Sequence, residues 1–127
     1  MKTGSKFYVC EHCGNIVGLI HDAGVPLYCC GEPMKHLEPN STDAATEKHM
    51  PTVTVEGNTL TVNVGEVTHP MQQEHFIQWV YLQTEHGGQR ISLSPNAEPV
   101  AVFSIEHDKP IAVFEYCNLH GLWKKEL

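Results

Sequence analysis

The chain has 127 residues, of which 41% are hydrophobic, and it carries a formal net charge of −7. This length suits one domain or one domain with a small appendage, and the composition can fill one ordinary core. The negative charge would repel a phosphate backbone, and no stretch approaches the roughly 20 apolar residues of a membrane span. The first residues lack the apolar run of a signal peptide. We therefore expect a cytoplasmic protein that binds neither nucleic acid nor a membrane.

Cysteine and histidine are the unusual residue types, with five and nine copies in the chain. An odd number of Cys fits poorly with a disulfide framework. In a reducing compartment, Cys clustered with His more often indicates a metal site.

Residues 1–37 hold four of the five Cys. We predict short strands there at Lys6–Val9, Ile16–Ile20 and Pro26–Tyr28. A unit below roughly 40 residues buries too little surface to fold alone, so it needs a metal, disulfides or a partner chain. The polar stretch Glu38–Glu47 is interpreted as a linker. We predict one domain over residues 1–37 and a second over residues 38–127.

After Pro51 hydrophobic and polar residues alternate, as in β-strands, and Glu56-Gly57-Asn58 is predicted to form a hairpin turn between two alternating runs. Turn signals are His86-Gly87-Gly88, Ser94-Pro95-Asn96 and Asp108-Lys109-Pro110. They separate further strands predicted at Phe76–Thr84, Arg90–Leu93, Val100–Ile105 and Ile111–Tyr116. No segment has a sustained helical period. Short strands at roughly 8–12-residue spacing predict an all-β protein whose second domain is an immunoglobulin-like antiparallel β-sandwich.

The first candidate metal site is formed by the C-x-x-C pair Cys10 and Cys13 and the adjacent pair Cys29 and Cys30. Four thiolates on two loops suit a tetrahedral S4 site for iron or zinc. The alternative of two disulfides would strain the vicinal pair and leave the segment without a core. The nearby histidines are interpreted as surface residues: His12, His21 and His36.

The second candidate site combines four His and one Cys, each of which alone would more simply be a structural residue. Loops at one end of a sandwich can bring distant segments together. Imidazoles with one thiolate favour iron or another transition metal over magnesium or calcium. The candidate ligands are His49, His69, His75, Cys117 and His120. Two other histidines match no ligand pattern and are interpreted as surface residues: His86 and His107.

Two groups of motifs carry a resemblance to a known family. Tyr8–Val17 with Cys29–Met34 resembles desulforedoxin, and the remaining motifs resemble the superoxide reductase domain of desulfoferrodoxins: Glu47–Pro51, His69–Met71, His75–Trp79 and Cys117–Trp123. The likeness covers nearly the whole chain in the right order. It implies two iron ions per chain, an FeS4 centre at the four N-terminal Cys and a His4Cys centre at the second group, with Cys117 opposite an open position.

The resemblance also implies a function. Superoxide would be reduced by one electron to hydrogen peroxide, a rubredoxin-like carrier would re-reduce the iron, and the protein would be a homodimer. Lys48 would guide superoxide and Glu47 would occupy the open position after oxidation, although both side chains could simply face water. The alternatives are a non-catalytic iron electron carrier and a zinc-stabilised binding module. Cys117 beside four candidate His ligands favours the enzyme.

Overall fold

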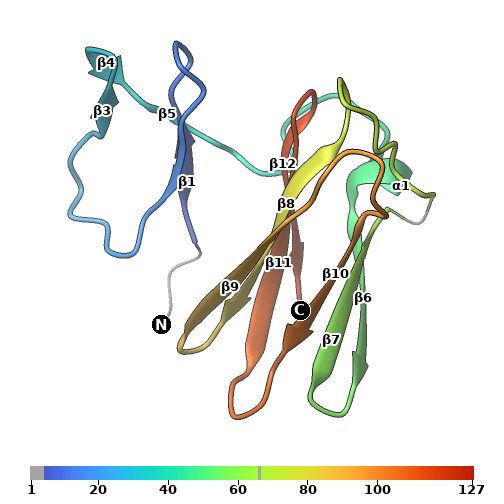
Figure 1. The fold of residues 1–127 in the computed structure, drawn as a ribbon. Coiled ribbons are helices and arrows are strands. Elements are labelled where there is room, and N and C mark those ends of the chain that lie inside the picture. The colour runs from blue at the N-terminus through green and yellow to red at the C-terminus, as the bar shows by residue number, and fades with distance from the viewer. Residues whose placement is uncertain (1–4, 66) are drawn as a thin grey trace. The chain divides into compact units, whose positions relative to one another are not determined.

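The computed structural model describes residues 5–65 and 67–127. Its contacts divide the chain into two compact units, Met1–Glu38 and Pro39–Leu127. Both units are built from antiparallel strands, which confirms the predicted all-β class (Figure 1). Within the described residues the helix α1 covers only Thr46–His49. No helix in that part of the chain has the length and apolar character needed to cross a membrane.

The first unit contains a three-stranded sheet with the order β2 (Ile16–Gly18), β1 (Phe7–Val9) and β5 (Lys35–His36). A separate pair of short strands is formed by β3 (Tyr28–Cys29) and β4 (Glu32–Pro33). Among the described residues of this unit, the buried hydrophobic side chains are Phe7 and Cys10. Two buried side chains make a very small core, in line with a unit that needs additional support.

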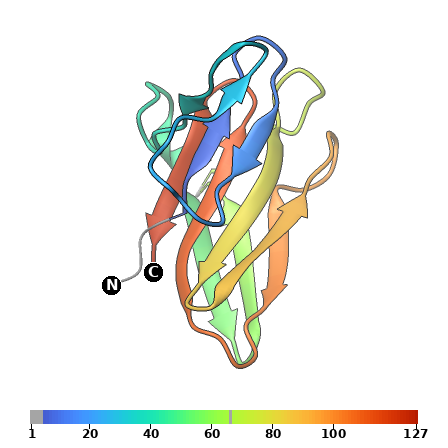
Figure 2. The same cartoon turned by 90° about the vertical axis from the view of Figure 1, so that its left-hand side faces the viewer.

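The second unit is a sandwich of two antiparallel sheets that face each other (Figures 1 and 2). One sheet has the order β10 (Val100–Ser104), β7 (Thr59–Val64) and β6 (Pro51–Glu56). The other has the order β12 (Gly121–Glu126), β11 (Pro110–Cys117), β8 (Ile77–Thr84) and β9 (Gly87–Ser92). The predicted hairpin turn joins β6 to β7, with Gly57 at a φ of 60°.

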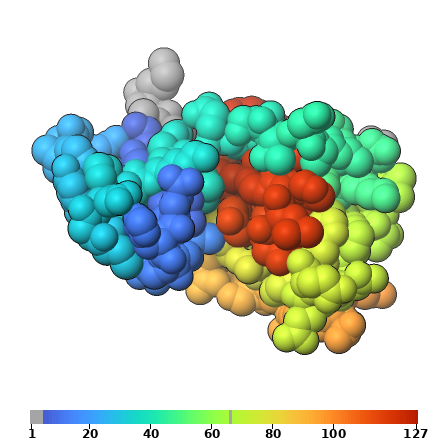
Figure 3. Space-filling view, turned by 90° about the horizontal axis from the view of Figure 1, so that it is seen from above, coloured from blue at the N-terminus to red at the C-terminus, as the bar shows by residue number. Residues whose placement is uncertain are grey.

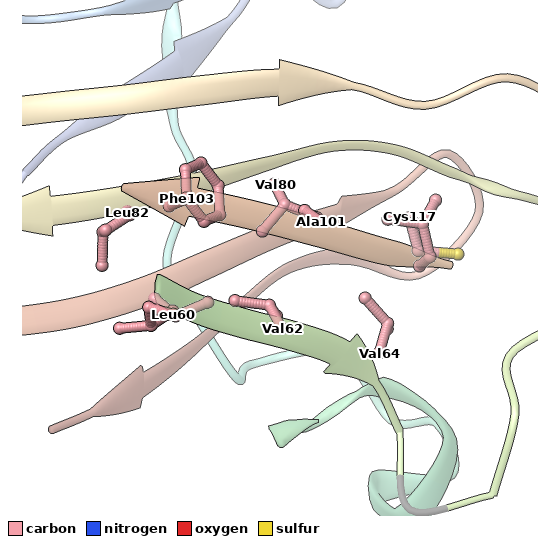
Figure 4. Packing of buried hydrophobic residues seen from close by; sticks show 10 residues of the cluster. Leu60, Val62, Val64, Val80, Leu82, Ala101, Phe103 and Cys117 are labelled. Atoms are coloured by element: carbon pink, nitrogen blue, oxygen red, sulfur yellow. The ribbon is translucent and has the colours of Figure 1, made fainter. Parts of the chain in front are cut away.

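The core lies between the two sheets and follows the period-2 pattern of the strands. On β7 the alternate residues Leu60, Val62 and Val64 are fully or almost fully buried. They pack with side chains of the opposite sheet, among them Val80 of β8. Figure 4 shows Cys117 at the same end of this cluster as Val64. One candidate ligand is therefore held by the hydrophobic core itself.

Some predicted element boundaries are wrong. The turn between β8 and β9 lies at Glu85 and His86, and Gly87 and Gly88 are strand residues instead of turn residues. The reason is steric, because a Cβ on Gly88 would overlap the Tyr81 hydroxyl group on the neighbouring strand. The helix α1 and the strands β4, β5 and β12 were not predicted.

The stretch predicted as a linker is bound to the second unit. Asn40 donates its backbone N–H to the Leu122 carbonyl at 2.9 Å, and its side-chain amide donates to the Lys124 carbonyl at 3.1 Å. The Lys124 N–H donates back to the Asn40 Oδ1 at 2.9 Å. These bonds fix the chain to the edge strand β12 shortly before α1 begins.

Candidate metal centres

The four N-terminal Cys form one compact group, called here the four-cysteine group. Their Sγ atoms all lie within 4.8 Å of one another, and all are free thiols. The Cys13 and Cys29 sulfurs are 3.6 Å apart, which is too far for a disulfide bond of about 2.05 Å. Four sulfurs around one metal at about 2.3 Å would be separated by roughly 3.8 Å. The separation of this pair therefore suits tetrahedral coordination better than disulfide bonding.

Local backbone structure prepares this group for a metal. The Cys13 N–H donates to the Cys10 sulfur at 3.5 Å, and this contact lowers the pKa of the Cys10 thiol to about 6. The side-chain amide of Asn15 donates to the Cys29 sulfur at 3.6 Å. Cys30 adopts a left-handed φ of 53°, which turns the chain between two adjacent Cys of the same group. The Cys10 and Cys29 sulfurs are thus supplied with donors that stabilise a thiolate, whereas the neighbouring Cys side chains raise the pKa of the Cys29 and Cys30 thiols.

The second group is assembled at one end of the sandwich. His49 ends α1, His69 and His75 lie in the segment between β7 and β8, Cys117 ends β11, and His120 lies in the β11–β12 turn. Their candidate ligand atoms all lie within 4.8 Å of one another. Figure 3 shows the segment around residue 120, in orange-red, between the teal-green segment of residues 40–50 and the yellow-green segment of residues 70–75.

The four imidazole rings are arranged as a square. Neighbouring ring centroids are separated by 4.5 Å for His49 and His69, 4.8 Å for His69 and His75, 5.0 Å for His75 and His120, and 4.8 Å for His120 and His49. The diagonal from His49 to His75 is 6.5 Å. Neighbouring rings are almost perpendicular, with interplanar angles of 74° to 89°. The rings therefore surround one central point.

The nitrogens at the centre of the square lie close together. The His49 Nε2 lies 3.0 Å from the His69 Nε2 and 3.1 Å from the His120 Nδ1. The other nitrogens of His49 and His69 donate to the carbonyls of Ala45 at 2.8 Å and Pro70 at 2.7 Å. Both Nε2 atoms therefore present lone pairs. Neighbouring ligands about 2.1 Å from a metal would be roughly 3.0 Å apart, which matches the observed spacing.

Burial favours the neutral form of three of these imidazoles, those of His49, His69 and His75. It lowers the pKa of His69 to about 4 and also lowers the pKa of His49 and His75. The His75 Nε2 is buried and finds no hydrogen-bond partner among the described residues. A buried nitrogen without a partner is costly, and a bound cation would satisfy it.

Cys117 is fully buried at the end of β11. The pairing of β11 with β8 is irregular here, because the register shifts between Tyr116 and Cys117. Such bulges redirect a side chain next to functional sites. Burial raises the pKa of the Cys117 thiol, while the backbone N–H groups of Leu119 and His120 lower it. A metal cation would add the charge that stabilises the thiolate.

Glu47 and Lys48 are both exposed, on the helix that carries His49. The positive charge of Lys48 lowers the pKa of His49 and of His75, although less than burial does, so that charge acts on the ring square. The Val67 N–H donates to the Glu47 carbonyl at 2.9 Å, and this bond attaches helix α1 to the segment that follows β7.

Three further residues around the second group were not predicted to act there. Trp123 stacks on His49 with ring centroids 5.0 Å apart. Asn118 is hydrogen-bonded to the loop of His75. Glu115 is completely buried, and burial raises the pKa of its carboxyl group well above the ordinary value. In the sequence, the signal for Glu115 is that a carboxyl residue lies within the largely apolar strand predicted at Ile111–Tyr116.

The remaining histidines lie at the surface, as predicted: His12, His21, His36, His86 and His107. Four of them lie near carboxylates, such as Glu32, which is 3.0 Å from His12.

The fold and the two groups define a class of protein in which a small unit with four clustered cysteines precedes a β-sandwich that holds a His4Cys group. Residues 3–37 match the family model for the desulfoferrodoxin N-terminal domain, and residues 41–126 match the model for desulfoferrodoxin. The chain belongs to the desulfoferrodoxin family, which confirms the resemblance found in the sequence.

Individual relatives agree with this assignment. The chain is 46% identical over 126 residues to the desulfoferrodoxin of Nitratidesulfovibrio vulgaris, with 99% of each chain covered. The crystal structure of the superoxide reductase from Treponema pallidum is similar with a TM-score of 0.83 and 34% identity, covering 98% of this chain and 100% of that one. A superoxide reductase (1Fe-SOR) from Giardia intestinalis is similar with a TM-score of 0.54 and 33% identity, covering 64% of this chain and 99% of that one.

Proposed function

We propose that this protein is a superoxide reductase that holds two iron ions. One would be bound by Cys10, Cys13, Cys29 and Cys30, and the other by His49, His69, His75, Cys117 and His120. The observation that carries the proposal is the square of four imidazoles beside a buried thiol. Relatives named superoxide reductase share the sandwich.

Iron in the second group would supply one electron to superoxide, which takes up two protons to become hydrogen peroxide, and an external carrier would restore the ferrous state. The protein residues prepare this chemistry. The Ala45 and Pro70 carbonyls hold His49 and His69 with their lone pairs inward. The thiolate of Cys117 contributes electron density, the role that Cys ligands have at other iron sites. One thiolate with four neutral imidazoles would leave a bound ferrous ion with a net positive charge, which would suit an anionic substrate.

Lys48 and Glu47 would have opposite roles. The ammonium of Lys48 acts electrostatically on two rings of the square, so it can attract superoxide and orient a proton-donating water. The carboxylate of Glu47 would bind the oxidised site after turnover. A lysine beside the group favours the enzyme over a protein that only carries electrons, since a carrier has no use for a charge that attracts a small anion.

We also propose a cytoplasmic homodimer that receives electrons from a rubredoxin-like carrier. The dimer is supported by the small core of the first unit and by the apolar side chains that this unit exposes, which are Val17, Ile20, Val25 and Tyr28. Sedimentation analysis of the purified protein should give twice the chain mass, and a monomer at micromolar concentration would contradict the dimer.

The experiment that tests the function is the replacement of Cys117 by Ser, with metal analysis and superoxide consumption measured on both proteins. The wild type should contain about two irons and consume superoxide. Cys117→Ser replaces a soft sulfur with a hard oxygen that is hardly ionised at neutral pH. We expect loss of the thiolate-to-iron absorption and a severe loss of activity.

Two outcomes would contradict the proposal. Two zinc ions in the wild type would exclude the redox reaction. Near-normal superoxide consumption by iron-loaded Cys117→Ser protein would show that the sulfur is not needed.

A further inference from the structure

Asn118 directly follows Cys117 and reaches across to the loop that carries His75. Its Oδ1 accepts the Phe76 N–H at 3.0 Å, and its Nδ2 donates to the Glu74 carbonyl at 3.0 Å. Its backbone N–H donates to the Phe76 carbonyl at 3.2 Å. One residue therefore makes three hydrogen bonds to the two neighbours of a candidate ligand.

The loop that Asn118 holds is a small closed turn. The His75 N–H donates to the Gln72 carbonyl at 3.0 Å, and the Gln72 N–H donates to the His75 carbonyl at 2.9 Å. Such a turn can shift as one body, and the side chain of Asn118 holds it at Glu74, within the turn, and at Phe76, just after it. The His75 and His120 rings, which lie on the two turns that Asn118 connects, are 5.0 Å apart.

We propose that Asn118 is a positioning residue for the His4Cys group, which locks the His75 turn to the β11–β12 turn and thereby sets how tightly the metal is retained. The inference rests on the metal binding assigned under the proposed function, but it requires neither iron nor superoxide. Residues that orient ligands without touching the metal typically change metal affinity by about 10–100-fold when they are replaced.

Asn40 offers a matched control. It also makes two side-chain hydrogen bonds and one backbone hydrogen bond, all to β12 at Leu122 and Lys124. Replacing Asn40 by Ala removes the same kinds of bond from the same unit, but it leaves the peptide groups beside His75 intact. Its left-handed φ of 60° makes the substitution at least as harsh for stability.

The experiment compares Asn118→Ala and Asn40→Ala with the wild type, each carrying iron and, separately, Co²⁺. The measurement is the rate at which a chelator bleaches the thiolate-to-metal absorption of the His4Cys group. We expect Asn118→Ala to lose either metal at least about tenfold faster than the wild type. Asn40→Ala should stay within about twofold, whatever its unfolding midpoint.

A second measurement uses the wild type, so it gives a result even if Asn118→Ala fails to fold. In the metal-free wild type, the Phe76 amide should exchange slowly with solvent, since Asn118 accepts its hydrogen bond. Rapid exchange there, or equal metal loss from both variants, would overturn the positioning role. A wild type that binds Co²⁺ but no iron would contradict the proposed function alone, and one that binds neither would overturn both.

Discussion

Lys48 and Glu47 are adjacent on α1, yet their charges act in opposite ways on an approaching anion. The protein carries −7 overall, so superoxide meets an unfavourable mean field. The ammonium of Lys48 opposes that field near the His4Cys group, where its charge lowers the pKa of His49 and of His75, although less than burial does. Neither side chain is buried, so water and salt screen both charges.

Replacing Lys48 by Ala should therefore slow the second-order reaction with superoxide by roughly two- to tenfold, the range expected for one screened charge near the reacting site. The dependence of the rate on ionic strength should also flatten. Glu47→Ala is the matched control and should leave this first step nearly unchanged, because a carboxylate cannot attract the anion. Rapid-mixing kinetics at several salt concentrations would measure both effects. If Lys48→Ala left both the rate and its dependence on ionic strength unchanged, Lys48 would have no role in attracting superoxide.

The residues of the two groups could be predicted because the four N-terminal Cys have the spacing of a metal site, and because the His and Cys motifs together resemble those of desulfoferrodoxins. The residues that support these ligands could not be predicted. Glu115 is a carboxyl group inside a buried strand, and Asn118 is a polar residue in a turn. By residue type alone, both look like ordinary surface residues, since most Glu and Asn side chains face water. Both are near Cys117 in the sequence, but only the folded structure shows that Glu115 is buried and that Asn118 is hydrogen-bonded to the loop of His75.

At the level of elements, the turn that carries Glu47, Lys48 and His49 is held by the chain that follows β7. The Gly65 N–H donates to the Met50 carbonyl at 3.1 Å. Gly65 has a φ of 85°, and a Cβ there would lie 2.5 Å from the Lys48 carbonyl oxygen. This close approach of two backbones is possible only without a side chain.

Replacing Gly65 by Ala should push the Lys48 carbonyl away and displace the turn. Gly57→Ala is the matched control, because Gly57 also has a positive φ, of 60°, but nothing lies within 4 Å of a Cβ built there. We expect Gly65→Ala to destabilise the protein by about 1–3 kcal/mol more than Gly57→Ala, the usual cost of overpacking. Denaturant unfolding would measure the difference, and equal losses would contradict the steric role of Gly65.

The elements that escaped prediction are those whose sequence signal is short. Helix α1 has four residues, too few for a helical period to appear. Strand β12 begins at Gly121, and its next two residues, Leu122 and Trp123, are buried, but it ends with charged residues, so no alternating pattern develops. Strand β7 could be predicted because its alternate residues are buried, and β8 could be predicted because it is long, largely apolar and buried along most of its length.

At the level of the whole molecule, the two groups belong to separate units. No candidate ligand of the His4Cys group lies before His49, and the four-cysteine group ends at Cys30. We expect Cys13→Ser to loosen the first metal and destabilise the first unit, because metal binding there contributes much of its folding free energy. Superoxide reduction should largely survive. Loss of activity with the second iron still bound would show that the two units depend on each other.

The two groups also differ in how far apart their ligands lie along the chain. The ligands of the four-cysteine group all fall between Cys10 and Cys30, whereas the second group needs His49 at one extreme and His120 at the other. During synthesis on the ribosome, the first group can capture its ion while most of the sandwich has still to be made. The second must wait until β11 has paired with β8 and the turn after it has formed. Maturation of the two centres should therefore be sequential, and a shortage of iron late in synthesis would leave protein loaded at the first centre alone.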